Sequence, residues 1–266
     1  MIKKVLIISY YYFQETEIGS VRIRGLVKYI KNYGWEPTVL TVAPQEEFHL
    51  AKQESNIICS DYVDLTQQFK AKVGLAKDKS VENQFLQSKI KQRSVTWAKR
   101  LWNEVIAYPD PMINWYTPAL SEGKKLLESK HFDAIISSSS PVTSHLVAST
   151  LKDQYDIPWI ADLRDLWTQN HGYQHSVLRK FRERCLEKKV LSSAEILTTV
   201  SSPWAEKLKE IHPKKQIVAI TNGYDPQILN NHQNLTKRFD IIYTGKVYRG
   251  EQNLRPLLQS LCMLKT

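Results

Sequence analysis

The sequence predicts an α/β fold, a doubly wound and mostly parallel sheet of the Rossmann-like type. The first observation is that Lys3–Ser9 (KKVLIIS) is a short apolar run rich in branched residues, which is typical of a strand buried on both faces. The second is that apolar residues recur at helical spacing after it, until Gly34 ends the helix and Glu36–Val42 forms another strand. The third is that this strand–helix order repeats along most of the 266 residues. Parallel strands need crossover connections, usually helices, so the alternation favours a parallel sheet.

The helix after the first strand carries the first functional indication. Ser20 stands where this helix would begin, as a suitable N-cap, and the helix is expected to run to about Tyr33. Arg22 and Arg24 fall in its first turns with no acid among them, although the helix dipole favours anions there. A bound phosphate or phosphosugar would relieve that conflict, and a solvated basic face is the alternative. The Gly-x-Gly-x-x-Gly pattern of dinucleotide-binding folds is absent.

The overall charge and composition favour anionic partners. The chain has 37 Lys and Arg against 27 Asp and Glu, a net charge of +10, and 42% hydrophobic residues. Such a balance suits phosphosugars or acidic membranes; no nucleic-acid-binding motif is present, so no nucleic-acid partner is expected. The 3 cysteines match no metal or redox spacing, and no apolar run fits a signal peptide or a membrane span. We therefore expect a cytoplasmic protein.

A strongly basic segment occupies residues 67–106. Residues 43–60 before it are polar and irregular, and Asp61–Leu65 is a candidate third strand. A basic amphipathic helix with tryptophans can lie on an anionic membrane surface, which would make the protein peripheral on the cytoplasmic face of the membrane. The alternative is that its apolar face packs on the protein's own sheet. The apolar positions of this helix are Leu86, Ile90, Trp97, Leu101 and Val105.

A second strand end leads into a helix farther along. After a helix at Ala119–Ser129, Phe132–Ile136 (FDAII) is a predicted buried strand, followed by Ser137–Ser140 and a helix at Val142–Gln154. Open α/β sheets bind ligands at such places, and a run of four serines exceeds what helix capping needs. His145, one turn into the helix, would reach the same crevice or else be a packed or solvated histidine.

Charged residues follow the next predicted strand, Ile157–Leu163 (IPWIADL). Alternation places Asp162 and Arg164 on one side and Asp165 on the other. Charges at the end of a buried strand are costly unless they are paired or contact a ligand. The two alternatives are therefore a ligand site and a structural ion pair between Asp162 and Arg164.

The rest of the chain continues the pattern. His171 and His175 are four residues apart, but no acid stands nearby and no metal site is expected. Asn222–Gly223 indicates a turn. The remaining predicted elements are a basic amphipathic helix at 174–191, a strand at 194–200, a helix at 201–211, a strand at 216–220, a linker at 232–237, a strand at 239–244 and a helix at 254–264.

Six stretches of the chain, taken in their order and spacing, carry a family resemblance. They are Gly19–Ser20 with the arginines after it, Gly34–Glu36, Ser138–Pro141, Asp162–Trp167, Asn222–Asp225 and Tyr243–Gly250. Together they resemble the family 4 glycosyltransferases, retaining enzymes with two facing Rossmann-like domains (the GT-B fold). The chain looks most like the sugar transferases of bacterial surface-polysaccharide assembly.

The resemblance implies roles for individual residues. Arg164 and Asp165 stand where many members carry a His-Asp pair at the active centre, and arginine cannot shuttle protons, so Arg164 is expected to bind an anionic group. The implied substrate-binding residues are Gly19, Ser20, Arg22, Arg24, Ser138, Ser139, Ser140, His145, Asp162, Asn222 and Gly223. Those implied for the donor diphosphate are Gly245, Lys246, Arg249 and Gly250. Their charge would stabilise the departing nucleotide diphosphate, so the donor is a nucleotide sugar and neither a cofactor nor a metal is expected.

The resemblance also implies a domain organisation. Residues 1–231 would form the acceptor domain, and residues 232–266 a linker and the first strand and helix of a truncated donor domain. We therefore expect an acceptor-binding domain, inactive by itself, of a retaining transferase that glycosylates a glycan or lipid-linked acceptor in polysaccharide or glycoconjugate synthesis. The alternatives are one subunit of a split transferase, whose donor domain is another chain, and a non-catalytic module that binds phosphosugars or membranes.

Overall fold

A computed structural model describes residues 2–13, 18–42, 56–60, 104, 107–170, 175–226, 240–243 and 253–264. The chain divides into two compact units, Met1–Tyr224 and Asp225–Thr266. In the second unit α10 (Arg255–Met263) confirms the last predicted helix. The strand predicted at 239–244 is wrong for the described residues 240–243, which belong to no strand.

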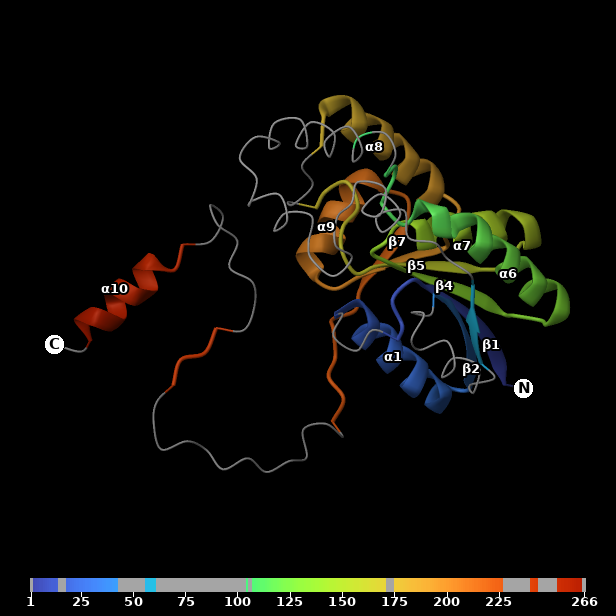
Figure 1. Ribbon diagram of the computed structural model, residues 1–266, viewed down its shortest axis with the longest axis horizontal. Helices are drawn as coiled ribbons and strands as arrows, with labels where there is room; N and C mark the ends of the chain where they lie inside the picture. The colour runs from blue at the N-terminus through green and yellow to red at the C-terminus, as the bar shows by residue number, and fades with distance from the viewer. Residues whose placement is uncertain are drawn as a thin grey trace, which may run out of the picture. The chain divides into compact units, whose positions relative to one another are not determined.

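The first unit is built on a seven-stranded sheet in the order β3-β2-β1-β4-β5-β6-β7 (Figure 1). All six neighbouring pairs are parallel, which confirms the predicted fold class. The direction in which strands are added reverses between β1 and β4, and open α/β sheets bind ligands at such a switch point. The strands are β1 (Lys3–Ser9), β2 (Trp35–Thr41), β3 (Ile57–Cys59), β4 (Ala134–Ser139), β5 (Trp159–Leu163), β6 (Ile196–Thr199) and β7 (Gln216–Ala219).

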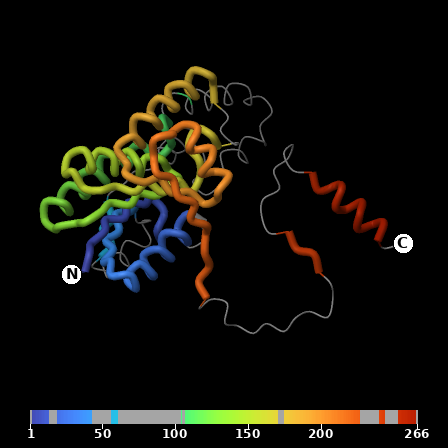
Figure 2. The backbone as a smooth tube through the Cα atoms, turned by 180° about the vertical axis from the view of Figure 1, so that it is seen from behind, coloured from blue at the N-terminus to red at the C-terminus, as the bar shows by residue number. Residues whose placement is uncertain are grey.

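Helices cover both faces of this sheet. One face carries α1, and the opposite face carries α6 and α7 (Figures 1 and 2). Among the described residues, no helix combines the length and apolar character that crossing a membrane would require. The helices of this unit are α1 (Ile18–Ile30), the 3-10 turns η1 (Lys31–Tyr33) and η3 (Ile113–Trp115), α6 (Tyr116–Ser129), α7 (Thr143–Tyr155), α8 (Val177–Leu191) and α9 (Ser202–Ile211).

Strand β1 belongs to two hydrophobic cores. Its side chains alternate across the sheet, so Val5 and Ile7 pack with Ile23 of α1 in one core. Leu6 and Ile8 point the other way into the larger core. All four side chains are fully buried, as the apolar run predicted. The larger core also contains Trp115, Val147, Leu151, Trp159 and Leu197.

The start of the first helix and the third strand differ from the predictions. Helix α1 begins at Ile18, so Ser20 is not its N-cap but a fully buried residue of its first turn. Gly34 does end this helical segment: its φ is 79° and its N–H bonds to the Lys31 carbonyl, a conformation that favours glycine. The third strand lies at 57–59, within a stretch predicted to be irregular, and 61–65 falls outside the described residues. The amphipathic helix predicted within the basic segment, at 85–105, also falls outside them except for residue 104.

Strand β4 runs three residues beyond its predicted end. Ser137, Ser138 and Ser139 are part of the strand and are buried. The first two serines are accommodated there because their hydroxyl groups bond to His145 and Asp162. The other predicted helices and strands of this unit have the predicted type and differ by a few residues at their ends.

Candidate functional site

The candidate site lies at the carboxyl edge of the sheet, around the switch point between β1 and β4. Five segments meet there: the first turns of α1, the ends of β4, β5 and β6, and the residues that follow β7. They are far apart in the sequence, and the parallel register aligns the ends of their strands. The cross-strand row that matters most is Ser138, Asp162 and Thr198.

The carboxylate of Asp162 lies at the centre of this cluster. Arg22 donates from Nε to Oδ2 at 3.0 Å and from Nη2 to Oδ1 at 2.8 Å. Hydroxyl groups complete the set, with Ser138 Oγ 2.8 Å from Oδ2 and Thr198 Oγ1 2.7 Å from Oδ1. Burial alone would raise the pKa of Asp162, but the bonds and charge of Arg22 and the two hydroxyl groups outweigh it and lower that pKa. Asp162 is therefore a buried carboxylate held ionised by protein groups.

Of the two alternatives for these residues, the structural ion pair between Asp162 and Arg164 is therefore not the one observed. The arginine that pairs with Asp162 comes from α1, on the face of the sheet to which Asp162 points. Arg164 comes after the last residue of β5 and pairs with Asp165 instead, with Nη2 3.3 Å from Oδ2. The strict alternation that suggested the pair ends with the strand.

Arg22 also holds the segment that leaves the sheet after β7. Its Nη1 atom donates to the carbonyl oxygens of Ile220 at 3.0 Å and Thr221 at 3.3 Å, and to Asn222 Oδ1 at 3.1 Å. Each guanidinium nitrogen of Arg22 therefore has a protein acceptor. In this structure Arg22 thus joins the Asp162 carboxylate to the segment after β7.

Arg164 lies against the first turn of α1. A Cβ atom at Gly19 would stand 2.6 Å from Arg164 Nη1, so only glycine lets the guanidinium approach this closely. Nε donates to the Ser139 carbonyl at 3.3 Å, and the side chain is 14% exposed. Asp165 beside it is 43% exposed. A partly accessible cation at the positive end of a helix dipole is an arrangement that a bound anion would stabilise.

The serine run and His145 separate into different environments. Ser140 is exposed, and the hydroxyl of Ser139 is buried with no hydrogen-bond partner among the residues that the structure describes. His145 is fully buried, with Nδ1 2.7 Å from Ser137 Oγ, which also accepts from Trp159 Nε1. Burial lowers the pKa of His145 to about 4, against a smaller opposing effect of Asp162. The packed alternative is thus the one observed, and His145 does not reach the crevice.

The other predicted site residues are placed as follows. Ser20 is buried in α1, Arg24 is exposed on it, and Asn222 and Gly223 are exposed after β7. His175 bonds through Nδ1 to Glu104 at 3.2 Å, and the described part of the chain contains no His, Cys, Asp and Glu cluster that would hold a metal. Gly245, Lys246, Arg249, Gly250 and His171 lie outside the described residues.

One residue of the cluster, Thr198, was missed by sequence reasoning. It lies in the AEILTTV strand, whose register with β5 sets it level with Asp162. The signal that was available is a threonine pair near the end of an otherwise apolar strand. Side chains at the same register position of neighbouring strands point to the same face of the sheet and lie side by side.

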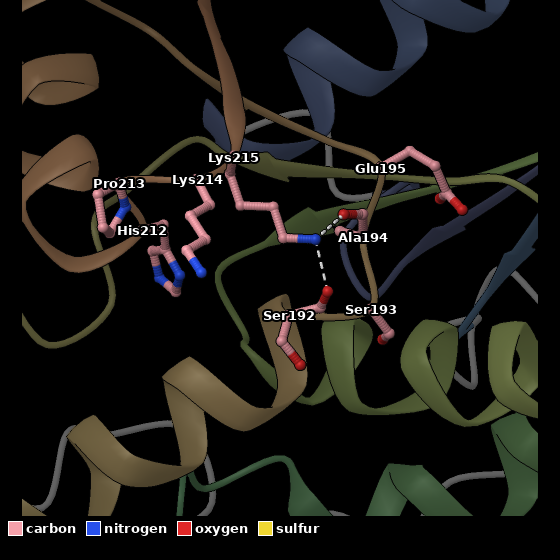
Figure 3. Close-up of a pocket in the computed structure, with 8 residues that line it drawn as sticks. All are labelled: Ser192, Ser193, Ala194, Glu195, His212, Pro213, Lys214 and Lys215. Atoms are coloured by element: carbon pink, nitrogen blue, oxygen red, sulfur yellow. Dashed lines mark hydrogen bonds between the residues drawn. The ribbon is translucent and has the colours of Figure 1, made fainter.

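A separate cavity lies at the opposite edge of the sheet, in the loops before β6 and β7 (Figure 3). It has a volume of about 610 Å³. Lys215 Nζ donates there to the carbonyl oxygens of Ser192 and Ala194, both at 2.5 Å, which satisfies acceptors at the end of α8. Because none of the cluster around Asp162 lines this cavity, it is distinct from the candidate site. Its lining residues are Ser192, Ser193, Ala194, Glu195, His212, Pro213, Lys214 and Lys215.

Comparisons with known proteins agree with this architecture. A family model described as "Glycosyl transferase 4-like domain" matches residues 19–223. No curated protein matches the chain. Among solved structures, sucrose-phosphate synthase from Thermosynechococcus elongatus is similar at 15% identity and a TM-score of 0.53, over 85% of this chain and 49% of that one. UGT89C1 of Arabidopsis thaliana, complexed with UDP, matches at 14% identity and a TM-score of 0.44, over 82% of this chain and 52% of that one. The chain thus spans about half the length of these structures, and at such identities the likeness shows the fold alone.

Proposed function

Because the chain belongs to the glycosyl transferase 4-like domain family, we propose that it is the acceptor-binding half of a retaining glycosyltransferase. Its donor would be a nucleotide-diphosphate sugar, and its acceptor a glycan or lipid-linked glycan in polysaccharide or glycoconjugate synthesis. The family match over residues 19–223 supports a part in glycosyl transfer. The basic segment 67–106 would hold the protein against the cytoplasmic face of a membrane.

One observation carries the site proposal: the guanidinium of Arg164 lies against Gly19 at the N-terminus of α1. The Ser139 carbonyl and Asp165 hold it in place, and a part of its surface remains accessible. We assign Arg164 the binding of an anionic group of a substrate, with Asp165 beside it at the reacting sugar. The guanidinium stays charged at every working pH, so it supplies electrostatic stabilisation and no proton.

The remaining polar residues would act by keeping this arrangement rigid. Asp162 is already saturated by hydrogen bonds from Arg22, Ser138 and Thr198. It therefore fixes the edge of the sheet against α1, where Gly19 lies. Preorganisation of this kind lowers the reorganisation needed when charge develops in the reaction. For the donor diphosphate, Lys246 and Arg249 remain the proposed cationic residues, without a metal ion.

The test is an isothermal calorimetric titration of the full chain with glucose 1-phosphate, which serves as a phosphosugar probe. The wild-type chain should bind, and Arg164→Ala should weaken binding about tenfold or more, because a hydrogen bond to a charged group contributes about 1.5–3 kcal/mol. Arg182→Ala, a change of an exposed arginine on α8, is the matched control and should bind as the wild type does. Equal binding by the wild type and Arg164→Ala would refute the assignment.

Turnover is the second test. We expect no transfer from UDP-glucose by this chain alone, since the chain spans about half the length of the transferase structures it resembles. Transfer restored by adding a separate chain that binds the nucleotide sugar would support the split-transferase alternative. Release of UDP at an enzymatic rate by the purified chain alone would contradict the proposal of an inactive half.

A further inference from the structure

The first turns of helix α8 bury charged side chains, whereas its last turn packs Val190 and Leu191 into the larger core as an ordinary amphipathic helix does. Its inward side carries charges: Arg179 is 4% exposed, and Glu183 and Glu187 are fully buried. Arg179 Nε donates to Glu183 Oε1 at 2.7 Å, one helical turn away. The sequence predicted a basic amphipathic helix here, for which apolar residues would be expected to face the protein.

Contacts from outside the helix fix this orientation. Arg179 Nη2 donates to the carbonyl oxygens of Ala107 at 2.7 Å and Pro109 at 3.0 Å. Trp167 Nε1 donates to Glu183 Oε2 at 3.0 Å. Rotating the helix to bury the apolar residues of its first turns would break these buried bonds and leave charges unpaired, which costs several kcal/mol.

Large apolar side chains consequently point outward. The exposed fractions are 86% for Val177, 69% for Leu178 and 68% for Phe181. These residues lie in the first turns of the helix, and helical spacing places them on one side of it. In both views α8 runs along the outer rim of the helical layer (Figures 1 and 2). Exposed apolar side chains gathered in this way indicate a contact surface.

Cations surround this apolar group. The outward and lateral positions of α8 hold five basic side chains, while both of its acids are buried on the inward side. Near the N-terminus of the helix, Glu104 Oε1 accepts from the Ser176 N–H at 3.0 Å. The α8 outer surface consists of Val177, Leu178, Phe181, Lys180, Arg182, Arg184, Lys188 and Lys189.

We propose that the α8 outer surface docks on an anionic lipid bilayer. Apolar side chains on a convex helix can enter the headgroup region, while the flanking lysines and arginines pair with lipid phosphates. A protein partner would need a complementary acidic groove to compensate five cations, whereas an anionic bilayer offers negative charge without a fixed geometry. The inference concerns a surface separate from the candidate site and does not depend on Arg164 or on glycosyl transfer.

The test is flotation of the full chain with phosphatidylcholine vesicles, with and without phosphatidylglycerol. One variant replaces the apolar group (Val177→Ser, Leu178→Ser and Phe181→Ser together), and another reverses two charges (Lys180→Glu with Lys188→Glu). The wild type should bind only the anionic vesicles, and each variant should bind them at least about tenfold more weakly, since one basic residue near the surface changes affinity about fivefold. All the altered side chains lie at exposed positions, so the thermal melting of the variants should match that of the wild type.

Matched controls separate this surface from general adsorption. Tyr33→Ser removes an 81% exposed aromatic ring from another element, and Lys130→Glu reverses an exposed charge after α6. Both controls should bind as the wild type does. The proposal is overturned if the wild type ignores anionic vesicles, or if the α8 variants bind like the wild type while a charge-reversal variant of 85–105 does not. It is also overturned if the apolar variant changes only the oligomeric state in size-exclusion chromatography, which would identify an interface between two copies.

Discussion

Replacing Arg22 by alanine tests the central contact of the candidate site. The change removes both charge-assisted hydrogen bonds to Asp162 and the bonds to the segment after β7. Breaking a buried ion pair by deleting one partner typically costs about 3–5 kcal/mol. Here the two side chains are 13% and 8% exposed, and Asp162 keeps its bonds to Ser138 and Thr198. We therefore expect Arg22→Ala to lower the free energy of unfolding by about 2–3 kcal/mol.

Urea unfolding followed by far-ultraviolet circular dichroism measures this loss. Asp162→Asn and the double variant complete a mutant cycle, in which we expect a coupling energy of at least about 1 kcal/mol, because the second change removes the charge that the first leaves unpaired. Lys31→Ala, a change of an exposed residue just after α1, should stay within about 0.5 kcal/mol of the wild type. An Arg22→Ala effect no larger than that of the control, or strict additivity in the cycle, would refute the ion-pair argument.

The same contact makes a prediction about pH. The folded-state pKa of Asp162 lies below its ordinary value, so its contribution is complete above the unfolded pKa and is lost as the pH falls through the folded one. Removing Arg22 takes away the principal influence that lowers this pKa. The acid loss of stability should therefore begin at higher pH in Arg22→Ala than in the wild type.

Three further predictions concern neighbouring residues. Gly19→Ala should displace the Arg164 guanidinium, because its Nη1 would lie 2.6 Å from the added Cβ. Binding of glucose 1-phosphate should weaken, while the urea midpoint should change little because the far end of the arginine side chain can move. Unchanged binding would contradict this prediction. His145 has a folded pKa of about 4, so the unfolded state takes up its proton first as the pH falls, and stability should decline between about pH 6.5 and 4. His145→Gln should flatten that part of the profile, and an unchanged slope would exclude the histidine as its source. Thr198→Val removes one of the bonds to Asp162 at constant shape and should cost about 1.5–3 kcal/mol in urea unfolding, whereas a neutral result would show that the bond is not needed.

Local patterns were enough to predict most of the fold. Strand β1 could be predicted because a short, continuous apolar run is typical of a buried strand. The end of the helical segment at Gly34 could be predicted because a left-handed residue after a helix is usually glycine. The repeated strand–helix order then predicted parallel pairing. These features depend on residues close together in the sequence.

Partners distant in sequence could not be predicted in the same way. Asp162 and Arg22 are 140 positions apart, and single-strand alternation suggested the nearer Arg164. The strand β4 continues through its serines because Asp162 and His145 accept or share their hydroxyl protons, which no local pattern reveals. The sequence correctly placed Asp162 at the carboxyl edge of the sheet. Only the packing of α1 on the sheet shows that Arg22 is the cation that pairs with it.

The burial of charged residues in helix α8 also depends on partners that are distant in sequence. Its inward charges are satisfied by the carbonyl groups of Ala107 and Pro109 and by Trp167, none of which belongs to the helix. A helical wheel assigns apolar residues to the interior, which holds for Val190 and Leu191 at the end of the helix but fails for the exposed apolar residues of its first turns. Polar partners elsewhere in the chain decide the outcome.

The double role of Arg22 has an evolutionary consequence. One guanidinium bonds both to the Asp162 carboxylate and to the backbone of Ile220 and Thr221. A substitution that alters one of these contacts therefore affects the others. A homologue without this arginine would have a buried carboxylate that lacks its counter-charge, and the segment after β7 would lose its hydrogen bonds to the side chain. Substitutions at positions 22 and 162 should therefore occur together across lineages, with an uncharged residue at one accompanied by an uncharged residue at the other.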